Sequence, residues 1–281
     1  RDHRESAQRR YTIQSTSMNI NHHTILITGG SSGIGAATCD YFARKGWTVF
    51  ELSRHGQSAT NITHIDCDVC DEQSVQNAIA QVLSLTDHID VVISNAGYGI
   101  SGPIECTPID QVAHQMDVNF IGAIRFTQAV LPQLRKQQYG RIIYTSSVAA
   151  TLAVPYQAFY SASKAAINAV ALALANEVRE WNISVSVLMP GDVKTAFTHA
   201  RKKSTVDHSL YPRAEKAIAI MEHDEQNGME PIQMAKIFYR IATCRSPKPQ
   251  YVGGIVYRLF CFLDRILPKR FVNWLEYKVY S

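Results

Sequence analysis

The sequence predicts a doubly wound α/β fold, in which helices cover both faces of a parallel β-sheet. From residue 24 onward, short apolar runs alternate with longer segments of helical character. Strands separated by helices need crossover connections, so they run parallel and are buried on both faces. A glycine-rich turn directly follows the first apolar run, as expected where a strand passes into a helix in this fold.

The strands and helices are expected to alternate along the chain. Thr24–Thr28 is the first strand, and the helical stretch after it runs to Lys45, with Gly46 as its stop signal. Trp47–Leu52 is the second strand. Further apolar runs predict strands at 62–65, 91–93, 141–145 and 183–188, with helices near 72–84, 108–136 and 157–181. No repeat or linker divides residues 18–281, which are expected to form one domain.

Composition and the N-terminal segment narrow the class of protein. Of the 281 residues, 46% are hydrophobic and 19% are charged, which is typical of a globular protein. Residues 1–17 begin with Arg1 and contain no apolar run, and we interpret them as a leader or a cloning-derived segment. No secretory segment precedes Met18, and no run of about 18 uncharged apolar residues occurs. A cytoplasmic protein is therefore expected.

Charge and cysteine usage argue against two kinds of site. The net charge of +4 divides into +2 for residues 1–17, +5 for residues 245–281 and −3 for the rest. Because a nucleic-acid partner needs a basic face on the folded body, none is expected. Six cysteines are too few for a disulfide framework and indicate a reducing compartment. The single C-x2-C pair, Cys67 and Cys70, has no second pair, so no metal site is expected.

The glycine-rich turn reads Thr-Gly-Gly-Ser-Ser-Gly-Ile-Gly over residues 28–35. Its glycines permit positive φ angles and close backbone approach, so amide groups and a helix N-terminus can face a pyrophosphate. The residues expected to contact it are Gly29, Ser31, Ser32, Gly33, Ile34 and Gly35. Taken alone, such a turn can also be a tight strand-to-helix connection.

The end of the second strand bears on the choice between NAD and NADP. NAD sites usually place an acidic residue there for the ribose hydroxyls, whereas an arginine can hold a 2′-phosphate. Ser53 takes the acidic position and Arg54 follows it, which favours NADP(H) over NAD(H). A one-residue shift in register would make Glu51 the acid, but strand alternation points its side chain elsewhere.

Tyr160 and Lys164 form the candidate catalytic pair, at the start of an Ala-rich helix. Their i, i+4 spacing puts both on one helix face, where the ammonium favours the phenolate and lowers the pKa of Tyr160. An incidental surface pair has the same spacing. Ser147 follows the strand 141–146 at the carboxyl edge of the sheet, where its hydroxyl can donate to a substrate oxygen or orient Tyr160. Ser146 is the neighbouring alternative.

These features, in this order, resemble the short-chain dehydrogenase/reductase family. The resemblance covers about residues 22–200 and rests on Thr28–Gly35, Asn95-Ala96-Gly97, Asn119, Ser147, Tyr160-x-x-x-Lys164 and Pro190-Gly191. It implies a Rossmann-type fold and a catalytic tetrad. In that tetrad Tyr160 is the general acid/base, Lys164 lowers its pKa and binds the nicotinamide ribose, Ser147 holds the carbonyl, and Asn119 supports a proton-relay water.

The resemblance also implies three further sets of cofactor contacts. Asp68 and Val69 would contact the adenine, and Asn95, Ala96 and Gly97 its ribose side. The nicotinamide contacts would come from Pro190, Gly191, Val193 and Thr195.

Two segments lie outside the resemblance. Residues 194–244 are polar, helical around 212–226 and 230–242, and follow the carboxyl end of a strand, so a helical substrate lid is expected there. Residues 245–281 are basic and rich in aromatic residues, with a helix expected over Val252–Leu267. This segment is expected to cover the body, close the pocket or form a subunit interface. The alternative is a peripheral contact with an anionic membrane.

The sequence therefore predicts an NADP(H)-dependent oxidoreductase that interconverts a carbonyl and a secondary alcohol by hydride transfer. Its substrate can be apolar, such as a lipid, sterol or retinoid. Two alternatives stay open: an NAD-dependent alcohol dehydrogenase, and a non-catalytic nucleotide-binding or redox-sensing protein. The resemblance implies a homodimer or homotetramer packed through the helices at 108–136 and 157–181, although the sheet they cover explains their apolar faces equally well.

Overall fold

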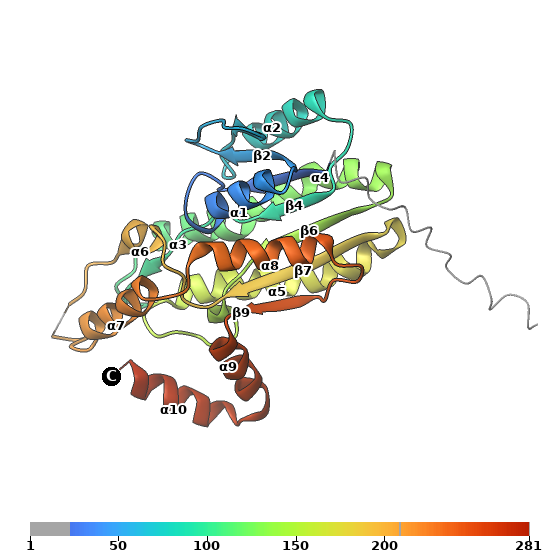
Figure 1. Ribbon diagram of the computed structural model, residues 1–281. Coiled ribbons are helices and arrows are strands. Elements are labelled where there is room, and N and C mark those ends of the chain that lie inside the picture. Colours follow the sequence, from blue (N-terminus) through green and yellow to red (C-terminus); the bar gives the residue numbers. More distant parts are fainter. Residues whose placement is uncertain (1–22, 208, 281) are drawn as a thin grey trace, which may run out of the picture.

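The computed structural model describes residues 23–207 and 209–280, with a seven-stranded sheet at its centre (Figure 1). The strand order is β3-β2-β1-β4-β6-β7-β9, and every neighbouring pair is parallel. The strands are β1 (Thr24–Thr28), β2 (Thr48–Ser53), β3 (Ile62–Asp66), β4 (Val91–Ser94), β6 (Gly140–Thr145), β7 (Ile183–Pro190) and β9 (Gln250–Gly253). The order reverses between β1 and β4, so the expected doubly wound sheet is confirmed.

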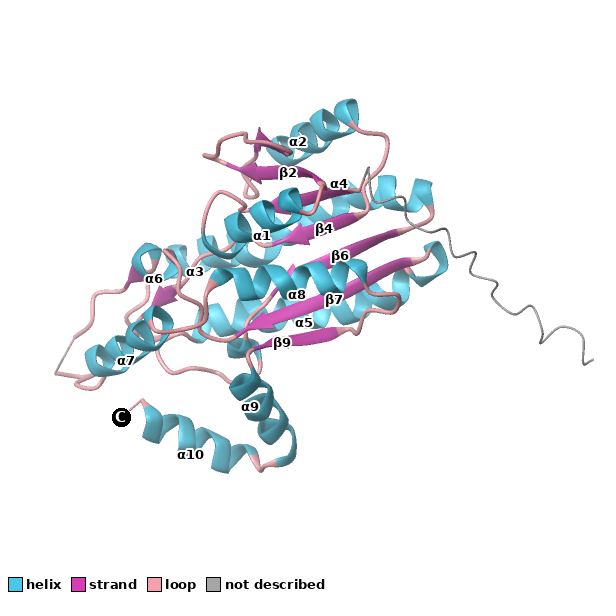
Figure 2. Ribbon diagram, in the orientation of Figure 1, coloured by secondary structure: helices cyan, strands magenta, loops and turns pink. Residues whose placement is uncertain are grey.

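Helices cover both faces of this sheet (Figure 2). One face packs against α2 (Glu72–Leu85), α4 (Gly122–Gln137) and α5 (Ala158–Glu177), and the other against α1 (Gly33–Arg44) and α8 (Pro231–Thr243). In β1, Leu26 belongs to the first hydrophobic cluster, and Ile25 and Ile27 belong to the second. Successive strand residues thus enter opposite cores, which is why the strand reads as a continuous apolar run.

The helix expected over 108–136 is interrupted in the structure. It is divided into α3 (Ile109–Met116), a π-helical turn (Asp117–Ile121) and α4. The turn inserts an extra residue into the helical ladder, a feature that composition does not reveal and that often occurs at functional sites.

Only part of the segment 194–244, which was expected to be a lid, lies apart from the core, because its last helix packs on the sheet. Its second helix, α8, packs against α1, and Met234, Phe238 and Ile241 are fully buried in the second cluster. Their helical spacing forms an apolar stripe that the sheet covers. The remaining elements are α6 (Phe197–Ala200), β8 (Lys202–Lys203) and α7 (Ala214–Gln226), and β8 pairs with the short strand β5 (Ile100–Ser101).

The C-terminal segment adds a strand and two helices. β9 pairs with β7 at the edge of the sheet, although Val252 was expected to be helical. The helix α9 runs over Ile255–Ile266, and α10 runs over Lys269–Val279 after Pro268. Figure 1 shows both helices beyond the edge strand, at the end of the molecule opposite α2.

The leader expected at residues 1–17 and the start at Met18 lie outside the described residues. Among those that are described, α5 is the one helix long and apolar enough to cross a membrane by length and composition. It contains Lys164 and packs against β7. α5 is therefore one of the helices that cover the sheet.

Candidate active site

A cavity of about 980 Å³ lies at the carboxyl ends of the strands. Residues immediately after β1, β2, β3, β4, β6 and β7 line it, because the carboxyl ends of parallel strands meet at one edge. Of the residues that the sequence predicts for cofactor binding and catalysis, all line this cavity except Gly35 and Asn119.

The glycine-rich turn lies between β1 and the N-terminus of α1. Gly29 and Gly33 have φ angles of +66° and +55°, which L side chains rarely adopt. A Cβ on Gly35 would lie 2.1 Å from the Gly29 carbonyl oxygen, so Gly35 allows the turn to close on itself. The Ser32 side chain does not cap α1, which leaves first-turn N–H groups for an anion. The turn therefore fits a dinucleotide phosphate.

Asn95 joins the ends of three strands. Its side-chain NH2 donates to the carbonyl oxygens of Thr28 (3.2 Å) and Gly29 (3.1 Å), and its Oδ1 accepts from the Thr145 hydroxyl (3.1 Å). The Thr28 hydroxyl in turn accepts the backbone N–H groups of Asn95 and Ala96. Asn95 thus holds the turn after β1 in place, as well as lining the cavity.

The residues at the end of β2 differ in their access to the cavity, although strand alternation alone would put Glu51 and Ser53 on one face. Ser53 and Arg54 line the cavity, and Glu51 does not. Glu51 is only 3% exposed, lies beneath Gly30 and forms a hydrogen bond of 2.5 Å with His64 Nδ1. The acidic side chain is therefore directed away from the place where an adenine ribose would bind.

Asn119 lies in the π-helical turn and is buried outside the cavity. Its Nδ2 donates to the Tyr98 carbonyl oxygen (2.9 Å) and to Ser163 Oγ (3.1 Å), and its Oδ1 accepts the Tyr98 N–H (2.9 Å). These bonds fix the loop after β4 against α5. Both N–H groups of the side-chain amide are thus used, and Oδ1 keeps one acceptor position.

Ser147, Tyr160 and Lys164 meet at the end of β6. Lys164 Nζ donates to the Thr145 carbonyl oxygen (2.9 Å) and lies 5.7 Å from the centre of the Tyr160 ring. Ser147 Oγ accepts the Ala149 N–H (3.1 Å), and the side chain lies near enough to Tyr160 to lower the pKa of its phenol. Ser146, the alternative candidate, is buried and donates to the Lys164 carbonyl oxygen (3.1 Å), so it anchors α5.

Burial shifts the pKa values of both ionisable groups. It raises the pKa of Tyr160 to about 12 and lowers the pKa of Lys164 to about 8. Ser147 and the charge of Arg201 lower the pKa of Tyr160, and Glu225 and Asp192 raise it further. The net shift for Tyr160 is opposite to the expected one, because burial outweighs the favourable contacts.

An ion pair that sequence reasoning missed lies behind Tyr160. The Arg201 side chain is 0% exposed and forms a salt bridge with Glu225, which also accepts the Thr198 hydroxyl (2.6 Å). The guanidinium lies 5.7 Å from the centre of the Phe197 ring, and that ring lies 5.6 Å from the ring of Tyr160. These contacts hold α6 and α7 next to the candidate catalytic pair. No local motif in the sequence signals a pair 24 residues apart.

The C-terminal helices form a further wall that the motifs did not reveal. Tyr257 packs over Gly191 and donates a hydrogen bond to Asp192, whose pKa is raised by burial. The side chains that α9, α10 and adjoining residues contribute to the cavity are Tyr257, Phe260, Leu263, Asp264, Leu267, Val272, Leu275, Glu276, Val279 and Tyr280. Closing the pocket was one of three roles expected for this segment.

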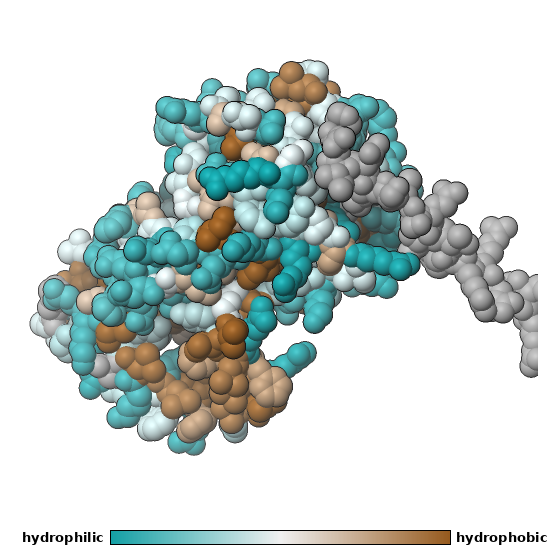
Figure 3. All heavy atoms as spheres, in the orientation of Figure 1, coloured by the Kyte–Doolittle hydropathy of each residue, from teal (hydrophilic) through white to brown (hydrophobic). Residues whose placement is uncertain are grey.

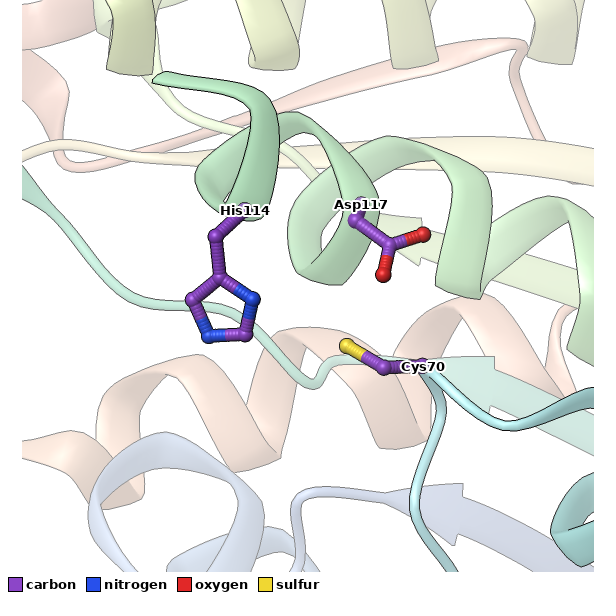
Figure 4. Close-up of side chains that lie close together, drawn as sticks. All are labelled: Cys70, His114 and Asp117. Atoms are coloured by element: carbon purple, nitrogen blue, oxygen red, sulfur yellow. The ribbon is translucent and has the colours of Figure 1, made fainter. Parts of the chain in front are cut away.

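Cys70, His114 and Asp117 lie close together beside the cavity (Figure 4). Their candidate ligand atoms lie within 4.8 Å of one another. Burial raises the pKa of the Cys70 thiol to about 12, and a hydrogen bond with Asp117 adds to this effect. Asp117 also pairs with Arg125 (2.8 Å). A protonated thiol and a paired carboxylate account for this cluster, and Cys67 lies apart from it in the hydrophobic core.

The fold and the site together define an NAD(P)-dependent dehydrogenase or reductase: a phosphate-binding turn and a Tyr–Lys pair share one cavity at the switch point of the sheet. The family model for short chain dehydrogenases matches residues 23–205, and the chain belongs to that family.

Similarities to individual proteins support this family assignment. The chain is 35% identical to a 3-ketodihydrosphingosine reductase of Bacteroides thetaiotaomicron, over 90% of this chain and 95% of the relative. It is 32% identical to a probable short-chain type dehydrogenase/reductase of Helicobacter pylori, over 89% and 94%. A solved short-chain dehydrogenase from Streptomyces avermitilis has the same fold, with a TM-score of 0.79, 24% identity and coverage of 92% and 97%.

Proposed function

We propose that the protein is an NADP(H)-dependent reductase that converts a long-chain amino ketone into the corresponding secondary alcohol, with Tyr160 as the general acid. The observation that carries this proposal is the make-up of the cavity. Arg54, the Tyr160 site and the apolar side chains of α9 and α10 all line one continuous space.

The preference for NADP(H) is supported by the residues at the end of β2. Arg54 is exposed at the cavity, where its guanidinium can bind a 2′-phosphate through charge-assisted hydrogen bonds. The Glu51 carboxylate is buried and hydrogen-bonded to His64, so it does not repel that phosphate at close range.

The catalytic roles follow from the protonation states. A pKa of about 12 keeps Tyr160 protonated at neutral pH, which suits an acid that gives its proton to the substrate oxygen. Ser147 holds that oxygen by a hydrogen bond, and the Lys164 ammonium stabilises the phenolate left behind. NADP(H), when bound, supplies the hydride for the carbonyl carbon. In the oxidative direction the same groups act in reverse.

The substrate class is inferred from the charges and apolar side chains of the cavity. Asp192, Asp224 and Glu225 line it together, and the two neighbours add to the burial that raises the pKa of Asp192. Because Glu225 is paired with Arg201, the charge that attracts an ammonium near the ketone comes from Asp192 and Asp224, whereas the α9 and α10 side chains suit a hydrocarbon chain. The similarity to a 3-ketodihydrosphingosine reductase supports the same class.

The acid role is tested with Tyr160→Phe. We expect NADPH-dependent reduction of 3-ketodihydrosphingosine to fall by about 10³-fold, since the phenol proton is lost. Stabilisation by NADPH in a thermal-shift assay should persist. Tyr139→Phe, on an exposed tyrosine outside the cavity, is the matched control and should keep full activity. Retained turnover in Tyr160→Phe would refute the role, and equal rates on a long-chain ketone without the amine would refute the substrate class.

The cofactor preference is tested by thermal shift with NADPH and NADH side by side. A ligand at 100 times its Kd stabilises the native state by about 2.7 kcal/mol, so a preference is measurable. We expect the larger shift with NADPH, and Arg54→Ala should remove most of the difference while leaving the NADH shift unchanged. A larger NADH shift in the wild type would mean that Arg54 does not select the cofactor.

We also propose a cytoplasmic, oligomeric protein. The six cysteines are all free, as in a reducing compartment. Ile121 on the π-helical turn and Leu172 on α5 are exposed and can contribute to a dimer contact. Light scattering of wild type and Leu172→Asp tests this, and a monomeric wild type would exclude it.

A further inference from the structure

The C-terminal helices carry an unusual concentration of exposed apolar side chains. Of the nineteen large hydrophobic side chains exposed among the described residues, eleven lie between residues 255 and 279. Ile255 is 83% exposed and Phe262 is 58% exposed. Figure 3 shows hydrophobic residues gathered at the end of the molecule where α9 and α10 lie. Contiguous apolar patches of this kind mark interaction sites.

The two helices have an inner and an outer face. The inner face lines the cavity, for example with Leu263, Leu267 and Val272. The outer face consists of the exposed residues Ile255, Leu259, Phe262 and Ile266 of α9 and Phe271 and Trp274 of α10. The α9 members recur at the spacing of one helix face, and the described residues of the fold leave that face open to solvent.

The helices of the outer face also carry exposed basic side chains, of which Lys269 pairs with Asp264. Arg258, Arg265, Lys269, Arg270 and Lys278 are all exposed. Residues 245–281 carry a charge of +5, whereas residues 18–244 carry −3. An apolar face with aromatic residues, on helices that carry basic side chains, matches the headgroup region of an anionic bilayer. A second copy of this chain would bring two sets of basic side chains together, which disfavours pairing through this face.

We propose that the outer face of α9 and α10 docks on an anionic membrane surface, and that the substrate enters the cavity from that side. Phe260, Leu275 and Val279 are exposed and also line the cavity, so the mouth of the cavity adjoins the outer face. The docking rests on the surface alone, and the entry of a lipid substrate rests on the proposed function.

Flotation with vesicles tests the docking without cofactor or substrate. The full chain is mixed at low salt with vesicles of phosphatidylcholine, or of phosphatidylcholine with 30% phosphatidylserine. We expect binding to the anionic vesicles at least tenfold stronger than to the neutral ones, and weaker binding at high salt. No binding to anionic vesicles at low salt would overturn the proposal.

Matched variants locate the contact. Phe262→Glu/Ile266→Glu changes the outer face without touching the cavity lining, and should weaken vesicle binding at least tenfold. Leu85→Glu changes a similarly exposed residue on α2, at the opposite end, and should bind as the wild type does. Thermal shift with NADPH verifies that both variants are folded. Equal binding by the double variant would overturn the assignment to this face.

Tryptophan quenching gives an independent readout. Trp274 lies on the outer face, so vesicles with brominated acyl chains should quench its emission, and Trp274→Phe should lose that quenching. If light scattering shows that the outer-face variant breaks a dimer and that the wild type binds no vesicles, the face is a contact between copies and the proposal is wrong. Failure of the proposed reductase activity would leave the vesicle result unchanged, so the two can be told apart.

Discussion

Lys164 shows how a single residue of the site opposes the stability of the fold. Its ammonium is buried beside Tyr160, with the Thr145 carbonyl oxygen as its hydrogen-bond partner. Burial lowers its pKa from 10.5 to about 8, which means that the native state binds this proton less tightly than the unfolded chain does. The cation that the proposed mechanism uses is thus held at a cost of roughly 3 kcal/mol when both states are protonated.

This cost predicts a specific pH dependence of stability. Between about pH 8 and 10.5 the unfolded state holds a proton on Lys164 that the native state has released, so this residue makes stability rise with pH. In urea unfolding without cofactor, we expect the free energy of unfolding of the wild type to rise relative to Lys164→Met over this range. Parallel pH curves for the two proteins would contradict the shift.

Individual residues differ in how far the sequence could place them. Ser53 and Arg54 line the cavity because they lie at the end of β2 at the carboxyl edge of the sheet, whereas Glu51 is held away from it by His64 on the neighbouring strand. Asn95 lines the cavity as expected, but its bonds to the ends of β1 and β6 depend on strands distant in sequence. Asn119 is bonded to Tyr98 and Ser163 for the same reason. Motif spacing indicates which residues gather, and the tertiary fold decides what each one touches.

At the scale of elements, the buried ion pair between Arg201 and Glu225 fixes the position of α6 and α7. Removing one partner leaves an uncompensated buried charge, which costs about 3–5 kcal/mol. We therefore expect Glu225→Gln to lose stability of this order in urea unfolding and to raise KM, because Phe197 would no longer be held against Tyr160.

A surface pair and a double variant serve as controls for that prediction. Lys203 and Glu222 form an ion pair nearby in which the lysine is exposed and the carboxylate half-buried, so Glu222→Gln should cost less than about 1 kcal/mol. Arg201→Met/Glu225→Leu replaces both charges by apolar groups and should recover most of the stability, but not the low KM. Equal losses for Glu225→Gln and Glu222→Gln would show that the buried pair does not hold these helices.

The elements that the sequence predicted well are those with a strong period. Six strands and the helices of the sheet follow from apolar runs and helical spacing, and the structure has them within a few residues. β9 was missed, because an edge strand of four residues that ends in the first of two glycines has too short a pattern. The predicted lid wrongly included α8. The average polarity of residues 194–244 conceals the apolar stripe of this helix, which packs on α1.

At the scale of the whole molecule, the cavity is assembled from two unequal parts. The sheet and its helices hold both hydrophobic clusters, and neither cluster includes a residue of α9 or α10. Within these two helices only Asp264 and Val272 are buried among the described residues. The C-terminal helices therefore shape the cavity while adding little to the core.

This division predicts the effect of ending the chain after Gly253, which keeps β9 paired with β7. With so little apolar area lost from the core, we expect the free energy of unfolding to change by less than about 2 kcal/mol. The NADPH thermal shift should persist, since the phosphate turn and Arg54 remain. Reduction of a long-chain ketone should fall at least tenfold, while a short ketone is reduced within a few-fold of the wild-type rate. If both substrates are affected equally, α9 and α10 serve the catalytic pair itself rather than the substrate chain.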